Sequence, residues 1–398
     1  MRITVLRTHT ANCLALYDSL RTLGHEVSVI VYDLISPDAF EHLPWIVNEN
    51  RPDWVLLIGA HHDYHPRPIM PVEILAKIGA KYPLVHLCCD GAEPVWWPQL
   101  QSYYDQGHFT LQVNIDGVRT GPIGERGLTM LSPIDPTPYP DPPRPWAQRT
   151  VALGFGGSVG APSHDRGRLI ADFTRSGLLT VRTRSDDGSI RDDDSSAAAY
   201  REFMSTCRCA WNYPATGGTT RMHVKGRPIE AALAGCLVLE HKDSPLADWF
   251  KPGEDYLSWG DAGDIMKCLG WVRTNPQEAE SMAATMRRKV LVQHSPTVFW
   301  ARVMERLGMD VGKVPALQQP PYRKWKPEQA AAAKPGGSDG PPQLLRSFNG
   351  LNLVAFGGAF YVAPQIMGPL DFTREEHRRR FGVQTFTDEG EARRVVGG

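Results

Sequence analysis

The stretch HVKGRPIEAALAGCLVLEH, residues 223–241, joins a group of charged residues to two apolar segments. The segment Ala231–Ala234 consists of strong helix formers, and Gly235 follows at a position where helices often end in a left-handed conformation. Cys236–Glu240 is a short apolar run of the kind that forms a buried strand. The stretch therefore predicts a helix that leads directly into a strand, which is the building unit of an α/β fold.

The charged residues Lys225, Arg227 and Glu230 lie near the N-terminal end of this predicted helix. That end carries N–H groups without helical partners and the positive pole of the helix dipole, so two cations there oppose the helix. The arrangement favours an anion, with phosphate as the leading candidate. Lys225 and Arg227 would neutralise a diphosphate, and Glu230 would accept hydrogen bonds from ribose hydroxyls. In the alternative interpretation the cations are solvated surface charges and Glu230 only complements the helix dipole.

The rest of the chain alternates between strand-like and helical patterns in two blocks. The first block runs from RITVLR at residues 2–7 to about residue 133, and the second runs from residue 149 to a predicted helix at 295–308. Between them, Pro133–Trp146 is rich in proline and predicts a linker or hinge. We therefore expect two doubly wound, Rossmann-like α/β domains that face a cleft, at residues 1–145 and 146–312.

The remainder of the chain has a different composition. Residues 313–343 are rich in Pro, Ala and Gly and predict a flexible linker. Within the appendage at 344–398, the runs LNLVAF and AFYVAP flank Gly357–Gly358, which predicts a β-hairpin. Because a lone hairpin is marginally stable in water, we expect it to pack on a larger domain or on a partner.

Composition limits the possible classes of protein. The chain has 398 residues and a formal net charge of −1, which gives no support to a nucleic-acid-binding surface. No apolar run approaches the ~20 residues that span a bilayer, so we expect no transmembrane segment. The N-terminus lacks the pattern of a signal peptide, and the seven cysteines form no metal-ligand pattern. These features predict a cytoplasmic protein with reduced thiols.

A second motif, GFGGSVGAPSHDRG at residues 154–167, follows the first predicted strand of the second domain. Glycines at such a turn let the backbone approach a phosphate and point N–H groups at it. The motif is neither a P-loop nor a complete G-x-G-x-x-G fingerprint. A tight loop without a ligand is therefore an equally simple interpretation.

These motifs, together with DWFKPGEDYLSWGDAGDI and HSPTVFWARVMERL, resemble the C-terminal domain of GT-B glycosyltransferases. The likeness is to the CgeB-like branch of the group 1 glycosyltransferases, with its K-G-R-x-x-E element, and it covers about Arg149–Gly308. It implies a GT-B fold in which Glu230 binds the donor ribose and Lys225 and Arg227 face the diphosphate. In the same comparison the glycine turn at Gly156, Gly157 and Ser158 lies against the phosphates.

The resemblance also implies an activity. The protein would be a hexosyltransferase-like enzyme that takes a sugar from a nucleoside-diphosphate sugar such as a UDP-sugar. The acceptor would be a glycan, a protein or a small molecule. It would need neither metal nor cofactor, because helix dipole and basic side chains take the charge of the leaving diphosphate. One departure is Met222, which stands where many relatives have a first glutamate. The alternative is therefore a non-catalytic nucleotide-binding or assembly protein on the same scaffold.

An enzyme that inverts the sugar's anomeric centre needs a base for the acceptor hydroxyl. We expect such a base at the carboxyl ends of first-domain strands, where His62, Asp63 and Asp90 are the candidates and His9 is a further one. The histidines of HHDYH, residues 61–65, have no specific metal-ligand spacing, and an acidic residue that ends a strand often only begins a loop.

Overall fold

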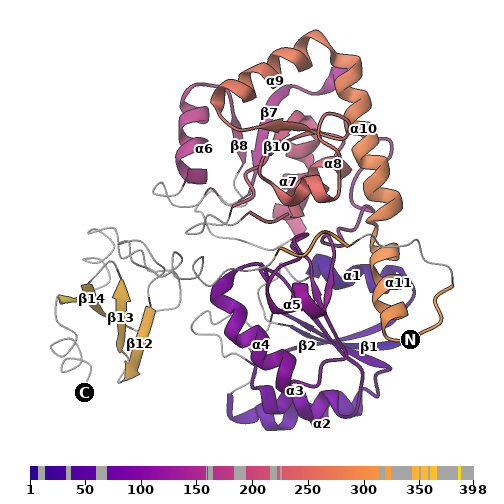
Figure 1. The fold of residues 1–398 in the computed structure, drawn as a ribbon, viewed down its shortest axis with the longest axis vertical. Helices are drawn as coiled ribbons and strands as arrows, with labels where there is room; N and C mark the ends of the chain where they lie inside the picture. The colour runs from indigo at the N-terminus through magenta and orange to yellow at the C-terminus, as the bar shows by residue number, and fades with distance from the viewer. Residues whose placement is uncertain are drawn as a thin grey trace. The chain divides into compact units, whose positions relative to one another are not determined.

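The computed structural model describes most of the chain between residues 1 and 323 and four short strands beyond it. The described ranges are 1–7, 14–32, 37–59, 70–157, 159, 165–182, 194–215, 222–224, 226–312, 319–323, 343–348, 351–356, 359–364 and 384–386. The chain divides into two compact units, Met1–Trp325 and Lys326–Gly398. The first unit contains two parallel sheets, and the second contains an antiparallel one (Figure 1).

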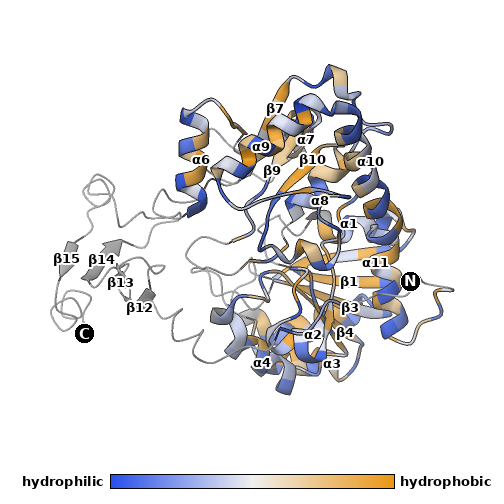
Figure 2. Ribbon diagram, turned by 45° about the horizontal axis from the view of Figure 1, so that its top comes forward, coloured by the Kyte–Doolittle hydropathy of each residue, from blue (hydrophilic) through white to orange (hydrophobic). Residues whose placement is uncertain are grey.

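The first parallel sheet has the strand order β2-β1-β3-β4-β5-β6. Its strands are β1 (Arg2–Arg7), β2 (Glu26–Val31), β3 (Trp54–Ile58), β4 (Leu84–Cys88), β5 (Leu111–Asn114) and β6 (Leu128–Thr129). Every side chain of β3 and β4 is buried, as expected for parallel strands covered on both faces. Figure 2 shows the hydrophobic residues concentrated along these strands.

Helices cover both faces of this sheet. On one face lie α1 (Leu14–Thr22) and α11 (Pro296–Arg306), and on the other lie α2 (Leu43–Glu49), α3 (Val72–Gly79) and α4 (Trp97–Gln106). The short elements η3 (Pro37–His42), η4 (Pro94–Trp96) and α5 (Gly121–Arg126) complete this half of the unit.

Helix α11 belongs to the core of the first sheet although it follows the second in sequence. Ser295 caps it by accepting a hydrogen bond from the Val298 N–H at 3.4 Å, as its sequence indicates. Phe299 and Trp300 lie in the same cluster as the side chains of β1 and β3, and the Trp300 indole N–H donates to the Ser19 hydroxyl at 2.9 Å. The helix that the sequence assigns to the second domain therefore packs on the first sheet.

The second parallel sheet has the order β11-β10-β9-β7-β8. Its strands are β7 (Val151–Gly156), β8 (Thr180–Arg182), β9 (Cys207–Trp211), β10 (Leu237–His241) and β11 (Leu257–Trp259). The helices that cover it are α6 (Asp165–Arg175), α7 (Asp194–Thr206), α8 (Gly226–Leu233), α9 (Ala262–Thr274) and α10 (Pro276–Gln293), with η6 (Pro245–Asp248) between β10 and β11. Gly235 has φ +78°, which confirms the left-handed end predicted for α8.

The proline-rich segment before β7 packs against the second sheet. Tyr139 and Trp146 are each 7% exposed and lie in its hydrophobic clusters, and Trp146 begins the short helix η5 (Trp146–Gln148). The predicted linker or hinge therefore contributes two side chains to the hydrophobic core, which its proline content alone does not indicate. Large aromatic rings bury enough apolar area to hold an otherwise irregular segment in place.

Arg149 joins this segment to the sheet behind it. Its side chain is 2% exposed, and its guanidinium donates to the carbonyl oxygens of Arg144, Cys207 and Ala234 at 3.0, 2.7 and 2.8 Å. Cys207 begins β9 and Ala234 directly follows α8. One buried arginine thus connects the linker, a central strand and the end of the helix that carries Arg227.

The second unit is an antiparallel sheet of β12 (Gln343–Phe348), β13 (Leu351–Phe356), β14 (Ala359–Pro364) and β15 (Gln384–Phe386) in sequence order. Strands β13 and β14 pair from Leu351↔Pro364 to Phe356↔Ala359. This pairing confirms the predicted hairpin.

Candidate functional site

The strand order places a ligand-binding edge in the second sheet. The chain leaves β7 toward β8 on one side and reaches β9 on the other, so the connections at the carboxyl ends of β7 and β9 diverge. In doubly wound sheets ligands bind in the crevice at such a point. Gly156 and Gly157 stand at the end of β7, Asn212 directly follows β9, and Arg227 is the second residue of α8.

Arg227 lies between these two strand ends. Its guanidinium donates to the Asn212 side-chain oxygen at 3.2 Å, and its Cζ atom lies 5.2 Å from the centre of the Phe155 ring. Gly157 has φ +127°, and a Cβ atom on it would stand 3.3 Å from Arg227 Nε. The glycine therefore leaves room for the arginine, and the aromatic face favours its charge.

Behind Arg227, Asn212 contacts the buried side chain of Glu240. The Asn212 amide donates to a Glu240 carboxyl oxygen at 2.6 Å, and Glu240 is fully buried at the end of β10. Burial raises the pKa of Glu240 to about 7, against the opposing effects of hydrogen bonds from Asn212 and Ser244 and of the Arg227 charge. Arg227, Asn212 and Glu240 thus form a continuous polar chain from the sheet edge into the core.

Glu230 has a support of its own. It is half-buried one turn beyond Arg227, and its carboxylate accepts a hydrogen bond from the Tyr200 hydroxyl at 3.1 Å. Tyr200 packs tightly on Gly156, where a Cβ atom would stand 2.2 Å from the tyrosine ring. A small cavity, with space for about one water molecule, is lined by Gly156, Tyr200, Asn212 and Arg227 among others.

A further cation, Arg166, stands near Arg227. It is the second residue of α6, whose N-terminus points to the same edge of the sheet. Burial and then the nearby charge of Arg227 lower the pKa of Arg166 to about 10. The contribution of the Arg227 charge shows that the two guanidinium groups lie close together at this edge, as an anion site requires.

The glycine turn differs in one respect from the prediction. The N–H group of Gly157 donates to the Arg182 carbonyl at 3.1 Å, so it supports β7–β8 pairing instead of pointing at a ligand. Ser158 and Lys225 lie outside the described residues, as do the first-domain candidates His62, Asp63 and His9. Their predicted roles stay predictions.

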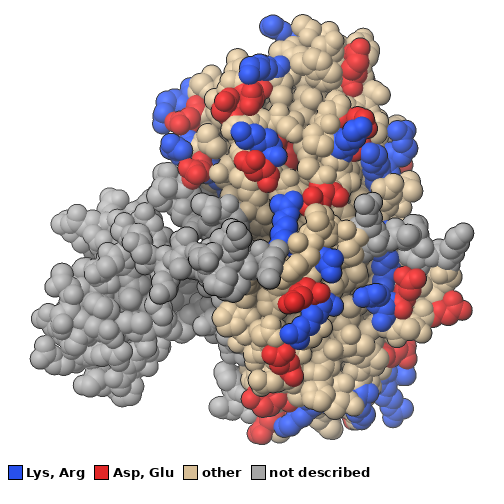
Figure 3. All heavy atoms as spheres, viewed as in Figure 1, with Lys and Arg blue, Asp and Glu red and all other residues tan. Residues whose placement is uncertain are grey.

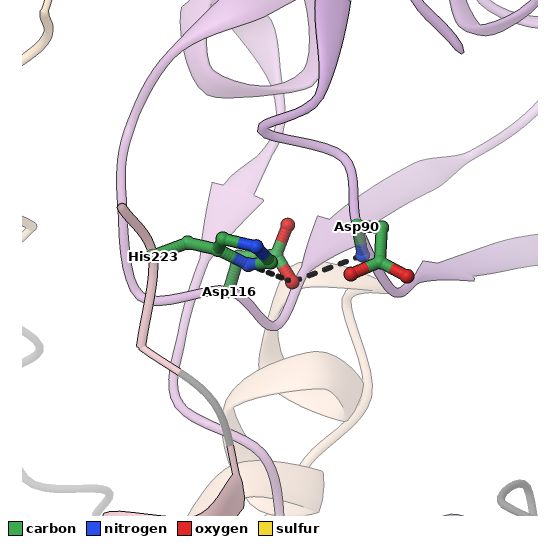
Figure 4. A group of neighbouring side chains, drawn as sticks. All are labelled: Asp90, Asp116 and His223. Carbon is green, nitrogen blue, oxygen red and sulfur yellow. Dashed lines mark hydrogen bonds and ion pairs between the residues drawn. The ribbon is translucent and has the colours of Figure 1, made fainter. Parts of the chain in front are cut away.

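Asp90, the remaining first-domain candidate, belongs to a cluster at the carboxyl ends of β4 and β5. The Asp116 carboxylate accepts hydrogen bonds from the backbone N–H groups of Asp90 and Ala92 at 3.0 and 2.9 Å. The fully buried His223 ring has one nitrogen 3.5 Å from Asp116 Oδ1 and the other 3.4 Å from Glu93 Oε1. Figure 4 shows Asp116 between His223 and the backbone of Asp90.

This cluster joins the two halves of the first unit. His223 comes from the segment that precedes α8, whereas its acidic partners follow β4 and β5. The next residue, Val224, donates its N–H to the Asp116 carbonyl at 2.7 Å, and the Trp249 indole N–H donates to the Gly117 carbonyl at 2.6 Å. The residues just before the Arg227 helix are therefore fixed to the first sheet.

Asp90, Asp116 and His223 are also the group that could hold a metal ion among the residues that the structure describes, since each offers a ligand atom within 4.8 Å of the others. Both oxygens of Asp116 already accept backbone N–H groups. These hydrogen bonds and the nearby His223 ring explain the cluster as a contact between the two halves of the first unit.

Part of the chain is similar to a known protein family. Residues 185–305 match the model of a family described as glycosyl transferase-like, and they include Asn212, Arg227, Glu230 and Glu240. This segment is similar to that family. No curated protein matches the chain.

Comparison with solved structures shows the fold of the chain. HepE from Anabaena, solved with UDP and glucose, is 13% identical with a TM-score of 0.50 over 77% of this chain and 99% of its own. An alpha-glucosyltransferase solved with UDP and mismatched DNA is 11% identical with a TM-score of 0.53 over the same shares. A glycosyltransferase from Rickettsia africae is 10% identical with a TM-score of 0.50, over 77% and 98%. The chain has the GT-B fold, as its sequence predicts.

Four residues of the site escaped the sequence analysis: Tyr200, Asn212, Glu240 and Arg166. Arg166 lies within the glycine motif at residues 154–167 and could have been found there. Acidic and basic side chains alternate over the face of the molecule in Figure 3, without a patch of one sign. Among the described residues, no helix is both long enough and apolar enough to cross a bilayer.

Proposed function

We propose that the protein transfers a sugar from a nucleoside-diphosphate sugar to an acceptor. The observation that supports this most is the position of Arg227 and Glu230. They stand three residues apart on α8, at the crevice of a parallel sheet, inside the segment that matches the glycosyl transferase-like family. Residues at this spacing share a helix face, so the cation and the carboxylate would meet one ligand together.

Each group has a role suited to its chemistry. Arg227, with Arg166 and Lys225, would bind the diphosphate, and Glu230 would accept hydrogen bonds from the ribose hydroxyls. The turn at 156–158 would lie along the phosphates. The arginines would stabilise the negative charge of the diphosphate as it leaves the sugar, so the reaction would need neither metal nor cofactor. UDP is the first nucleotide to test, because HepE and the alpha-glucosyltransferase were solved with it.

The first half of the unit would hold the acceptor, which is a glycan, a protein or a small molecule. If the reaction inverts the anomeric centre of the sugar, the acceptor hydroxyl needs a base, for which Asp90, His62 and Asp63 are the candidates. Of these three, Asp90 is the one that the structure describes. In its most detailed form, the proposal is that a CgeB-like enzyme transfers a hexose in the cytoplasm.

Nucleotide binding is tested by thermal unfolding in the presence of UDP, GDP, ADP and CMP. A nucleotide at a hundredfold excess over its Kd should stabilise the wild type by about 2.7 kcal/mol. Arg227→Ala and Glu230→Ala should lose most of this shift, whereas Arg273→Ala and Glu278→Ala, at exposed positions of α9 and α10, should keep it. If no nucleotide raises the melting temperature of the wild type, the proposal is wrong.

Turnover separates the enzyme from a non-catalytic binding or assembly protein. The second function is favoured by Met222, which provides no carboxylate where many group 1 enzymes have one. Release of nucleoside diphosphate from the matching sugar nucleotide, absent in Arg227→Ala, would establish transfer or hydrolysis. Binding without release would favour the non-catalytic function.

A further inference from the structure

The orientation of Arg227 is determined by residues that lie behind it. An arginine side chain has many rotamers, and about 2 kcal/mol of rotamer entropy opposes its fixation by a ligand. In this structure the guanidinium already rests on Phe155 beside Gly157, and its NH1 group donates to Asn212. A pre-oriented cation binds a diphosphate more tightly than a mobile one, because less entropy is lost on binding.

Asn212 can accept a hydrogen bond from Arg227 only if the oxygen of its side-chain amide points at the guanidinium. An asparagine amide has an accepting oxygen and a donating NH₂ group, and the two can exchange places by rotation. The Asn212 NH₂ group donates to Glu240 at 2.6 Å, which leaves the oxygen directed at Arg227 at 3.2 Å. The Asn212 backbone is fixed too, since its N–H donates to the Leu239 carbonyl at 2.9 Å.

We propose that Asn212 and Glu240 are positioning residues that orient Arg227 toward the diphosphate of the donor. This inference rests on the proposed function. Both residues lie behind Arg227: Glu240 is fully buried, and Asn212 is 3% exposed. Glu240 orients the Asn212 amide, the amide orients the guanidinium, and the guanidinium meets the phosphates.

A buried polar pair could also serve stability alone, so the test has to separate the two roles. If Asn212 acts through Arg227, its removal weakens nucleotide binding only while Arg227 is present. A double-mutant cycle measures this dependence directly. Stability alone would lower the melting temperature and leave the Kd of the folded protein unchanged.

The experiment measures the Kd of UDP by calorimetry for the full chain and for Asn212→Ala, Arg227→Ala and the double variant, with GDP, ADP and CDP in parallel. Asn212→Ala should raise the Kd about 5- to 10-fold, as expected for one lost hydrogen bond. In the Arg227→Ala background the same change should leave the Kd within twofold. The control Asn275→Ala removes an amide that bonds only within its own helix junction, to Trp271 and Thr274, and should leave the Kd unchanged.

Glu240→Leu should weaken binding about as much as Asn212→Ala. Glu240→Gln keeps an accepting oxygen and should restore most of the affinity, and it covers the case in which the leucine variant fails to fold. Equal effects of Asn212→Ala with and without Arg227, or no effect at all, would overturn the positioning role while leaving the proposed function intact. A wild type that binds none of the nucleotides would instead overturn both.

Discussion

The carboxyl edges of the two parallel sheets use polar residues in opposite ways. At the second sheet, Arg227 and Glu230 are half-buried, and glycines at the end of β7 make room for the side chains of Tyr200 and Arg227. At the first sheet, Asp116 and His223 are buried, and the Asp116 carboxylate lies 3.5 Å from a nitrogen of the His223 ring. The first arrangement is suited to a ligand that comes and goes, whereas the second is part of the packing between the two halves.

The difference shows that two parallel sheets of the same type can carry polar residues with different roles at their carboxyl edges. Both sheets bring polar side chains to the ends of neighbouring strands. The support behind them decides the outcome: backbone N–H groups satisfy the Asp116 carboxylate, whereas Asn212 and Tyr200 hold Arg227 and Glu230 toward the crevice. Four substitutions test this contrast.

The largest effect is expected at Asp116. Asp116→Ala removes the acceptor of two backbone N–H groups and one carboxylate beside the buried His223. Loss of one partner in such a buried group should cost about 3–5 kcal/mol of unfolding free energy. Urea unfolding measures it, and Asp105→Ala, an exposed carboxylate paired with Arg126, should cost less than about 1 kcal/mol. Equal effects of the two changes would contradict a packing role for Asp116.

The second effect depends on pH and belongs to Glu240. Its pKa is about 7 in the folded protein and 4.5 in the reference state, so protonation favours the folded form. This stabilisation is complete below pH 4.5 and is lost as the pH rises through 7, a change of about 3 kcal/mol. Glu240→Gln should therefore gain stability relative to the wild type between pH 5 and 8.

His294 contributes the opposite trend, because burial lowers its pKa to about 4 and the stability linked to it is lost as the pH falls. Both proteins carry His294, so it cancels in the difference between their melting temperatures. A difference that stays constant from pH 5 to 8 would show that Glu240 does not titrate in this range.

The third effect tests the space in front of Tyr200. Gly156→Ala places a Cβ atom 2.2 Å from the tyrosine ring, which must shift at a cost of about 1–3 kcal/mol. Thermal unfolding measures the loss. The matched change Gly270→Ala lies in α9 with nothing within 4 Å and should stabilise the protein by about 0.5–1 kcal/mol. A neutral Gly156→Ala would mean that Tyr200 has room to move.

The smallest effect is expected for Tyr200→Phe, which removes the hydroxyl that donates to Glu230. One lost hydrogen bond corresponds to about 0.5–1.5 kcal/mol, or a 2- to 10-fold rise in the Kd of UDP. Inorganic pyrophosphate lacks a ribose, and its Kd should not change. If both ligands weaken equally, Glu230 does not act on the ribose.

Local patterns were sufficient to predict the elements that carry the site. The alanine-rich run, Gly235 and the following apolar segment predict α8 and β10 because each depends on neighbours along the chain. The same holds for the helix predicted at 295–308, which is α11. Arg227 and Glu230 could be chosen as candidates because charge at a helix N-terminus is conspicuous in the sequence.

Contacts between distant segments could not be predicted in this way. Asn212 and Glu240 stand at the ends of neighbouring strands and meet only when the sheet forms. The return of α11 to the first sheet and the burial of Tyr139 depend on which apolar surfaces remain uncovered. Single residues in the sequence carry no signal of such pairings.

Arg149 gives helix α8 an unusual electrical environment. Its buried guanidinium donates to the Ala234 carbonyl, at the negative pole of a helix whose positive pole carries Arg227. A diphosphate bound at the other end would place the eight-residue helix between a permanent cation and an exchangeable anion, each at the pole that favours it. The positive charge of Arg149 would then offset the negative pole of the helix dipole. This would make the electrostatic potential at the Arg227 end more positive, before any anion binds.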